Sequence, residues 1–260
     1  MIEKKRQLLK SIEEAELVLV GLGKEFIVDD SAFSNWELFQ KWKEADKEGN
    51  YLWMEPFLKI VWMKEQEGLE NQRAYENLAK LLEGKNYFIV TLATDDMIYA
   101  SGLNGDKIVA PCGSVSKLQC HCTEEIFYFT KEMEQQLKNA VLSGNLAECK
   151  PFECPNCNEL LQSNVISTQT YNEAGYLPVW EMYTKWLQGT VNRKVCIIEA
   201  GVDFSYPSVI RFPFEKIAFF NQKASFYRIH EKWYQLTEEL KDKSTAIACN
   251  GKEFFMNLFV

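Results

Sequence analysis

Leu17-Val18-Leu19-Val20, followed directly by Gly21-Leu22-Gly23, is the stretch that decides the fold expected of this chain. Four apolar residues in a row predict a strand buried on both faces, as in a parallel sheet covered by helices. Residues 3–15, just before it, place apolar side chains at helical spacing. The sequence therefore predicts a helix, a buried strand and a glycine turn in succession.

The same alternation of elements recurs along the chain. Helical spacing continues in residues 36–48, 72–83 and 179–187, and the other strand-sized apolar runs are Tyr87–Leu92, Val195–Ile198 and Ala224–Ile229. Buried strands that alternate with amphipathic helices are typical of the α/β class. We therefore expect a Rossmann-like, mostly parallel sheet that helices cover on both faces.

Two pairs among the eight cysteines, Cys120-x-Cys122 and Cys154-x-x-Cys157, indicate a metal site. Four thiolates with such spacers can surround a zinc ion tetrahedrally. Because side chains would fill all four positions, the predicted zinc is structural and takes no part in a reaction. The competing interpretation is four thiols without a metal.

The first pair leaves the ligand set open. Cys-x-Cys is tighter than the more usual two-residue spacer, so Cys149 or His121 is an alternative for one of the four ligands. The pairs lie around a polar helical stretch near Lys131–Leu142. We expect a small zinc-binding module over residues 113–162, inserted into a Rossmann-like, NAD-binding-type domain formed by residues 1–112 and 163–260.

Composition excludes several classes of function. The net charge of −8 repels phosphate backbones and argues against general nucleic-acid binding. The strongest apolar runs are far shorter than the roughly 20 residues that a membrane-spanning helix needs, and the charged start does not resemble a secretion signal. The expected location is the cytoplasm, without membrane contact and with cysteines that are reduced or metal-bound.

Residues after the first two strands are candidates for binding a ligand. Gly21 and Gly23 lie where a doubly wound sheet brings backbone amides close to a dinucleotide phosphate. A third glycine is missing, and Lys24–Ile27 places bulk and a carboxylate where small residues would help the phosphate approach. A purely structural turn therefore stands beside the phosphate loop. Asp95 would hold a ribose hydroxyl or cap the next turn.

Cys112 is the candidate catalytic residue. A thiol in a loop acts as a nucleophile or base only where a histidine, a cation or a helix N-terminus lowers its pKa. The chain has two histidines, His121 and His230, and neither is an obvious partner in the sequence. An inert, structural cysteine is the competing interpretation.

Taken in order, these elements resemble the sirtuin (silent information regulator) family over nearly the whole chain. The matching segments are Val18–Gly23 with the family's opening strand and GAG turn, Ile89–Asp95 with TQNID, Cys112–Ser114 with HG(S/T), Leu118–Cys120 and Cys154–Cys157 with the zinc module, and Leu161–Val165 with the segment that leaves it. Further on, Ile198–Val202 and Tyr206–Phe214, with Phe226–Ile229 as the next strand, resemble the LELGVGYNTPxIIKYPF stretch of the macrodomain-linked class M branch, which is associated with protein ADP-ribosylation.

The resemblance implies a large Rossmann-type domain, a small zinc-bearing domain, and NAD bound in a cleft between them. It implies NAD or an ADP-ribose-like nucleotide as ligand, with Gly21, Gly23, Asp95 and Gly201 as cofactor-binding residues, and a protein substrate or partner that the sequence does not identify. Family chemistry breaks the bond between nicotinamide and ribose, and an acyl-lysine or other acceptor then attacks the sugar.

Four positions depart from the family pattern. Leu92 and Ala93 replace the glutamine and asparagine of TQNID, Cys112 replaces the histidine of HG(S/T), and Ile166 stands where the class M branch has an arginine. Leucine, alanine and isoleucine side chains form no hydrogen bonds. The sequence therefore predicts a degenerate NAD site and a catalytically impaired binding or regulatory protein.

Two alternatives stay open. The first is an active NAD-dependent protein ADP-ribosyltransferase or deacylase, a sirtuin-type transferase, in which a Cys112 thiolate deprotonates a ribose hydroxyl or captures the sugar. The second keeps the sheet but binds another small ligand, in a cleft walled by Trp53, Phe57 and Trp62. These aromatic residues belong to a stretch, 49–66, without clean periodicity, which would otherwise be an irregular cover over the core.

Overall fold

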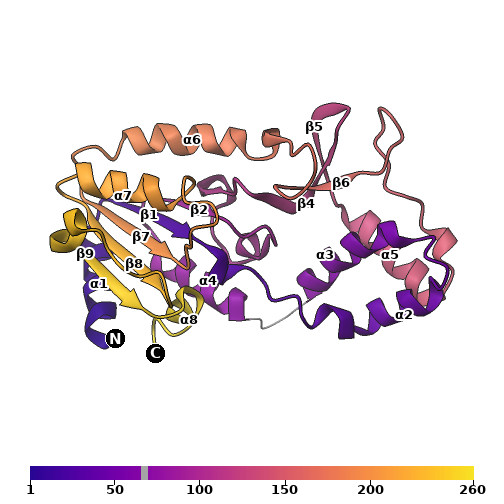
Figure 1. The fold of residues 1–260 in the computed structure, drawn as a ribbon, viewed down its shortest axis with the longest axis horizontal. Coiled ribbons are helices and arrows are strands. Elements are labelled where there is room, and N and C mark those ends of the chain that lie inside the picture. Colours follow the sequence, from indigo (N-terminus) through magenta and orange to yellow (C-terminus); the bar gives the residue numbers. More distant parts are fainter. Residues whose placement is uncertain (66–69) are drawn as a thin grey trace. The chain divides into compact units, whose positions relative to one another are not determined.

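The computed structural model describes residues 1–65 and 70–260, and the chain forms two compact units. The first unit comprises Met1–Ile27, Gly68–Cys112 and Tyr176–Val260, and the second comprises Val28–Glu67 and Gly113–Gly175. Each unit has its own sheet and its own helices (Figure 1).

A six-stranded sheet forms the centre of the first unit, in the order β3-β2-β1-β7-β8-β9. Every neighbouring pair in it is parallel. Its strands are β1 (Leu17–Leu22), β2 (Tyr87–Thr91), β3 (Ile108–Val109), β7 (Val195–Ala200), β8 (Ser225–His230) and β9 (Ser244–Ala248). All residues of β1 and β7 are buried, as the uninterrupted apolar runs predicted.

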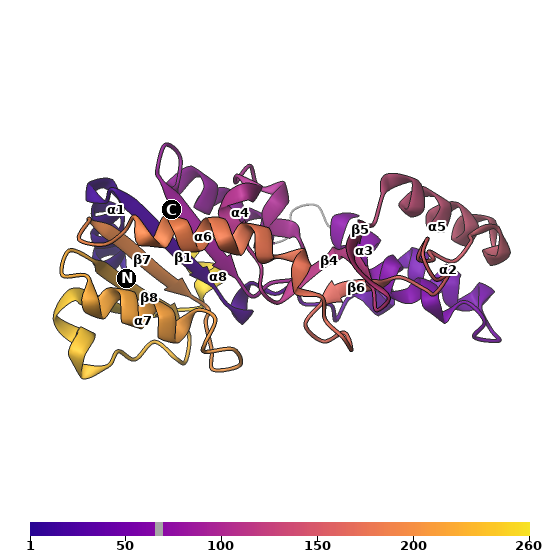
Figure 2. The ribbon, with the colours of Figure 1, turned by 90° about the horizontal axis from the view of Figure 1, so that it is seen from above.

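Helices cover both faces of this sheet. On one face, apolar side chains of α1 (Ile2–Glu14), α4 (Glu70–Leu81) and α8 (Gly251–Met256) join a core with those of the strands. On the other face lie α6 (Leu177–Gln188) and α7 (Arg211–Phe220) (Figure 2). Their apolar side chains join a second core with those of the strands. The predicted α/β class, with a parallel sheet between two helical layers, is confirmed.

Among the described residues, the second unit combines a small antiparallel sheet with three α-helices. The sheet has the order β5-β4-β6. Its elements are β4 (Gly113–Cys120), β5 (Thr123–Tyr128), β6 (Gln162–Val165), α2 (Glu37–Ala45), α3 (Glu55–Glu65) and α5 (Lys131–Ser143). A third hydrophobic core joins the helices to the cysteine-bearing loops.

This second unit is larger than the module that the sequence predicted over 113–162. Val28–Glu67 belongs to it as well, because the apolar faces of α2 and α3 pack onto the core that contains Cys120 and Cys154. Of the aromatic stretch 49–66, residue 66 lies outside the described residues. Phe57 and Trp62 are 2% and 3% exposed in that same core, and Trp53 packs against it, so these rings serve as core.

None of the helices in residues 1–65 and 70–260 has both the length and the apolar character that crossing a membrane requires.

A buried cluster of charges ties β7, β8 and α7 together. Arg228 donates from Nε to Glu199 Oε1 at 2.7 Å and from Nη2 to Glu199 Oε2 at 3.0 Å, a two-point pairing between adjacent strands. Arg228 also contacts Glu215 at 2.6 Å, and Arg211 contacts Glu199 at 3.3 Å. The side chains of Arg228 and Glu199 are each only 1% exposed. Such charges are stable in the interior only while they remain paired.

Replacing Arg228 by alanine is expected to lower the free energy of unfolding by about 3–5 kcal/mol, because the buried Glu199 carboxylate would lose its two-point partner. Chemical denaturation measures this change. Arg193→Ala is the matched control, since Arg193 pairs with Glu16 at the surface, where both side chains are more than two-fifths exposed. Its cost is expected to be about 0–1 kcal/mol. Equal costs for the two variants would contradict this account of the cluster.

Candidate functional site

The strand order of the large sheet reverses between β1 and β7. From β1 the chain adds β2 and β3 on one side, and from β7 it adds β8 and β9 on the other side. In open parallel sheets, ligands bind outside the carboxyl ends of the strands at such a switch point. The loops that follow β1 and β7 are therefore the first place to look for a ligand site.

The backbones of these two loops touch at Gly23 and Gly201. A Cβ on Gly23 would lie 2.1 Å from the carbonyl oxygen of Gly201, so only glycine fits at position 23. The Gly23 N–H donates to the Ala200 carbonyl at 2.8 Å, and the Glu25 N–H donates to that of Gly201 at 3.3 Å. Of the predicted cofactor-binding residues, the structure thus brings Gly23 and Gly201 together.

Gly21, by contrast, has a packing role. It lies within β1, and a Cβ there would come within 2.4 Å of Ile210 Cγ2 and 2.8 Å of the Phe214 ring. Phe214 lies in α7, and Ile210 immediately precedes this helix. The missing side chain at Gly21 therefore allows α7 to lie close against the sheet. Glycine at position 21 is explained without a ligand.

The carboxylate of Glu25 lies directly over this edge of the sheet. Its two oxygens accept hydrogen bonds from the backbone N–H groups of Glu231 and Gly251, which follow β8 and β9. The sequence singled out this residue only as a carboxylate in an unfavourable place for phosphate. Its partners lie 206 and 226 residues further along the chain, so no local pattern could identify them.

Asp95 follows β2 and is 8% exposed. Its Oδ1 accepts a hydrogen bond from the Met97 N–H at 3.1 Å, and the next residue, Asp96, has a positive φ of 63°. This is the geometry of an aspartate that closes a tight turn on its own backbone. The observed contact matches the capping alternative for Asp95.

The three side chains of this unit at positions that resemble sirtuin motifs are buried. Leu92 is 3%, Ala93 is 4% and Cys112 is 2% exposed. Cys112 packs in the core beneath α6 and α7. Burial raises the pKa of the Cys112 thiol to about 11, although the nearby charge of Lys24 acts in the opposite direction. At neutral pH this thiol is protonated and is a poor nucleophile.

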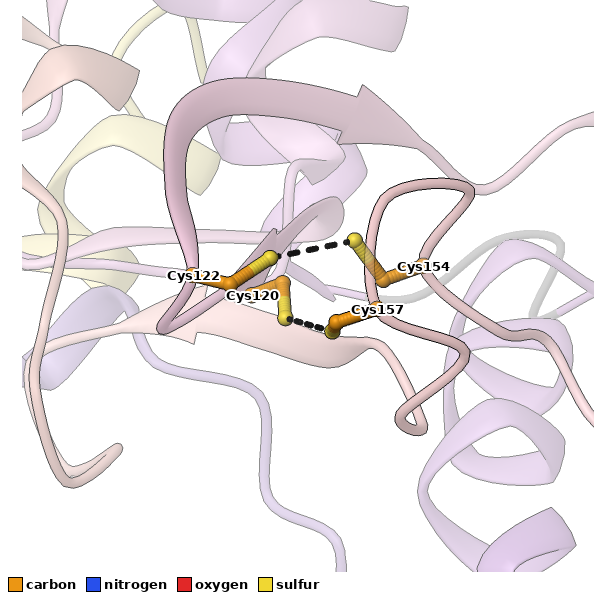
Figure 3. A group of neighbouring side chains, drawn as sticks. All are labelled: Cys120, Cys122, Cys154 and Cys157. Atoms are coloured by element: carbon orange, nitrogen blue, oxygen red, sulfur yellow. Dashed lines mark hydrogen bonds between the residues drawn. The ribbon is translucent and has the colours of Figure 1, made fainter.

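The four cysteines predicted to bind metal come together in the second unit. Their Sγ atoms all lie within 4.8 Å of one another, with 3.4 Å between Cys120 and Cys157 and 3.6 Å between Cys122 and Cys154 (Figure 3). These distances exceed the S–S bond length of about 2.05 Å in a disulfide. Tetrahedral zinc with bonds of about 2.3 Å separates its sulfur ligands by about 3.8 Å. The donor set and its spacing fit a structural zinc.

Two tight turns present these sulfur atoms. Cys120 ends β4, and Cys122 immediately precedes β5, so the first pair flanks the turn of a hairpin. In the second turn, the Asn158 N–H donates to the Cys154 carbonyl at 2.9 Å, and the Cys154 N–H donates to that of Glu159 at 2.7 Å. The positive φ of 61° at Asn158 lets the chain fold back there.

His121 and Cys149, the two alternative zinc ligands, lie outside the cysteine quartet. The His121 Nδ1 is 3.0 Å from a carboxylate oxygen of Glu159, and the two side chains are mostly exposed. With Cys120 they form a second grouping of possible ligands, which shares one sulfur with the cysteine quartet. Cys149 is buried, with its Sγ 3.8 Å from the Lys150 carbonyl, and belongs to neither grouping of the described residues.

A buried amide network lies in the same unit, around Asn164, and sequence reasoning did not anticipate it. The Asn164 Nδ2 donates to Gln119 Oε1 at 2.6 Å and to the Asn172 carbonyl at 2.8 Å. Gln119 Oε1 also accepts from the Asn172 N–H at 2.9 Å. This network fixes the loop after β6 onto β4. The Asn164 Oδ1 has no hydrogen-bond partner among the described residues.

Comparison with known proteins agrees with this architecture. No family model matches the sequence. A curated relative from Staphylococcus aureus (strain Mu50 / ATCC 700699), named protein ADP-ribosyltransferase, is 20% identical over 276 residues, which cover 94% of this chain and 84% of the relative.

Solved structures show the fold. Sir2Tm bound to a propionylated peptide superposes with a TM-score of 0.53 at 17% identity, covering 98% of this chain and 97% of that one. A Sir2 homologue in complex with NAD gives 0.54 at 16% identity, over 97% and 91% of the two chains. A sirtuin structure concerned with substrate affinity also superposes with a TM-score of 0.54 at 16% identity, covering 97% of this chain and 96% of that one. The chain has the sirtuin fold.

We expect purified protein to contain about one zinc ion per chain, measured by elemental mass spectrometry. Cys154→Ser should remove most of this zinc and lower the Tm by at least roughly 4 °C, the shift that corresponds to about 1–2 kcal/mol in a chain of this size. Cys249→Ser is the control, because Cys249 lies in the first unit outside the quartet. A wild-type protein that is folded and free of metal would contradict the zinc assignment.

Cys112 is expected to resist alkylation in the native protein. With a pKa of about 11, only on the order of one thiol in ten thousand is a thiolate at neutral pH, and the sulfur is buried as well. Mass spectrometry after treatment with iodoacetamide should find Cys112 unmodified in the native state and modified in urea. Rapid labelling of native Cys112 at neutral pH would show instead a reactive, accessible thiol.

Proposed function

We propose that this protein is a degenerate sirtuin, related to the class M branch, that has lost efficient NAD-dependent transfer and acts as a binding or regulatory protein. The proposal rests on the chemistry of three side chains in the first unit, at the positions that resemble sirtuin motifs. Leu92 and Ala93 are apolar, and Cys112 is a buried thiol with a raised pKa.

The chemistry of the family explains why these side chains matter. Breaking the bond between nicotinamide and ribose develops positive charge on the sugar, and the attack that follows needs a group to accept a proton. Preorganised polar groups lower such a barrier, and removal of one of them typically costs about a hundredfold in rate. General-base catalysis adds a further factor of about 10²–10⁴. Leu92 and Ala93 offer neither effect, and a protonated Cys112 is a poor base.

The cysteine quartet has a separate, structural part in this proposal. We propose that Cys120, Cys122, Cys154 and Cys157 hold zinc, and that the metal joins the β4–β5 turn to the Cys154–Cys157 turn. All four ligands are side chains of the protein, so no position remains for a substrate. Zinc would thus stabilise the second unit and supply no reactive group.

A second candidate function is supported by one comparison. The Staphylococcus aureus relative is named a protein ADP-ribosyltransferase, and its similarity extends over most of both chains. On this alternative, the chain transfers ADP-ribose from NAD to a protein. A Cys112 thiolate would be the base, which requires a conformation in which this sulfur becomes solvated and its pKa falls.

Incubation with NAD distinguishes the two functions. The wild-type protein is expected to release nicotinamide no faster than a protein-free blank and to leave candidate protein acceptors unmodified, as followed by chromatography and mass spectrometry. Turnover that scales with protein concentration and disappears in Cys112→Ala would overturn the proposal, and modification of a protein acceptor in the same reaction would establish the second candidate. Turnover equal in wild type and Cys112→Ala would overturn the proposal too, while excluding Cys112 as the base.

Restoring the family's polar groups provides a matched test of the reason for inactivity. The triple variant Leu92→Gln, Ala93→Asn, Cys112→His returns three side chains that can form hydrogen bonds. If their loss explains the inactivity, nicotinamide release at saturating NAD should rise to at least about tenfold above the protein-free blank, a small part of what such groups contribute in active enzymes. Circular dichroism confirms that the variant is folded.

A further inference from the structure

The Glu25 side chain crosses the carboxyl ends of several strands in the first unit. Glu25 itself lies in the loop after β1. Its Oε1 accepts from the Glu231 N–H, after β8, at 3.1 Å, and its Oε2 accepts from the Gly251 N–H, after β9, at 2.5 Å. A Cβ on Gly201, after β7, would lie 2.7 Å from the Glu25 Cβ. The side chain therefore fills the space over the ends of β7, β8 and β9.

Two glycines make room for this carboxylate. Gly201 has a positive φ of 67°, and a side chain there would collide with that of Glu25. A Cβ on Gly251 would lie 3.2 Å from Glu25 Oε2 and 2.7 Å from the Gly201 backbone nitrogen. The Glu25 side chain is only 11% exposed as a result. Its position is fixed by packing as well as by hydrogen bonds.

His230, the nearest ring, does not neutralise Glu25. The His230 Nδ1 lies 3.1 Å from Glu25 Oε1, but it already accepts hydrogen bonds from the N–H groups of Lys232 at 2.9 Å and Trp233 at 3.2 Å. A ring nitrogen that accepts carries no proton, so the proton of the neutral ring is on Nε2. Burial also lowers the pKa of His230. This contact is therefore not an ion pair.

The surroundings make the buried carboxylate costly. Burial raises the pKa of Glu25, the hydrogen bonds from Gly251 and Glu231 offset part of that increase, and the negative charges of Glu231 and Glu253 add to it. Lys24, the adjacent cation, lies 3.7 Å from Asp203. Two backbone N–H groups thus provide the main stabilisation of the Glu25 charge.

We propose that Glu25 is a built-in occupant of the nucleotide site, whose carboxylate competes with the diphosphate of an ADP-ribose-type ligand. Ligands of open parallel sheets bind at this edge, next to the switch point. Phosphate oxygens accept hydrogen bonds from backbone N–H groups as carboxylate oxygens do, so a diphosphate cannot take these two donors while Glu25 holds them, and the negative charges of the two groups repel each other. This inference rests on the proposed function in one respect, namely that the edge is a former nucleotide site.

Calorimetric titration with ADP-ribose tests the proposal. Glu25→Ala frees the two N–H groups and removes the charge. One hydrogen bond to a charged group is worth about tenfold or more in an equilibrium constant, so ADP-ribose should bind the variant at least about tenfold more tightly than the wild type. ADP-ribose should likewise raise the Tm of the variant more than that of the wild type.

Two further variants strengthen the test. Glu25→Asp keeps a carboxylate but is one methylene shorter, so it should withdraw from the two N–H groups and also bind ADP-ribose more tightly than the wild type. If the alanine variant fails to fold, the affinity of Glu25→Asp for ADP-ribose still tests the proposal. Lys24→Ala is the control in the same loop, because it changes a neighbouring charge without freeing either N–H group. It should not increase the affinity.

A folded Glu25→Ala variant that binds ADP-ribose no more tightly than the wild type would overturn the proposal. If that variant does not fold, the same result for folded Glu25→Asp would overturn it. These outcomes are distinct from those that bear on the proposed function. The titration reads binding of ADP-ribose, whereas the function is judged by nicotinamide release from NAD. Turnover by the wild type would leave the comparison of the Glu25 variants intact.

Discussion

The contact between the backbones of Gly23 and Gly201 is the constraint on which the ligand-facing edge of the sheet depends. A side chain on Gly23 would lie 2.1 Å from the Gly201 carbonyl oxygen, closer than any packed atom can come. Because β1 and β7 pair at the point where the strand order reverses, this contact holds together the loops that follow the two central strands. It also directs the chain after β1 across the strand ends, which brings Glu25 over β8 and β9.

The sequence predicts this frame well because the signals are local. Four apolar residues at Leu17–Val20 and the run Val195–Ile198 define two buried strands without reference to anything else in the chain. The cysteine pairs are equally local, and each forms one turn. The four sulfur atoms meet because the hairpin of β4 and β5 and the turn at Asn158 bring the two pairs together.

Other features depend on partners far away in the chain, which a single sequence does not reveal. The helical spacing in 36–48 identifies a helix, yet it does not say that α2 packs on the cysteine-bearing unit instead of the large sheet. Glu199 and Arg228 read as ordinary charges within apolar strands until the parallel register pairs them. For Glu25, the sequence shows only a carboxylate at a position unfavourable for binding phosphate. The fold is needed to identify the two backbone N–H groups that donate hydrogen bonds to it.

The Glu25 carboxylate has a structural role at this edge as well as the competing role that we propose. An apolar residue of similar size would avoid the desolvation cost of a buried charge, but it would leave the Glu231 and Gly251 N–H groups without their acceptor. Leu92 and Ala93, just after β2, show that apolar side chains are buried elsewhere along this sheet edge. A carboxylate over these strand ends thus satisfies two backbone N–H groups of the chain itself, in the way that the oxygens of a bound diphosphate would.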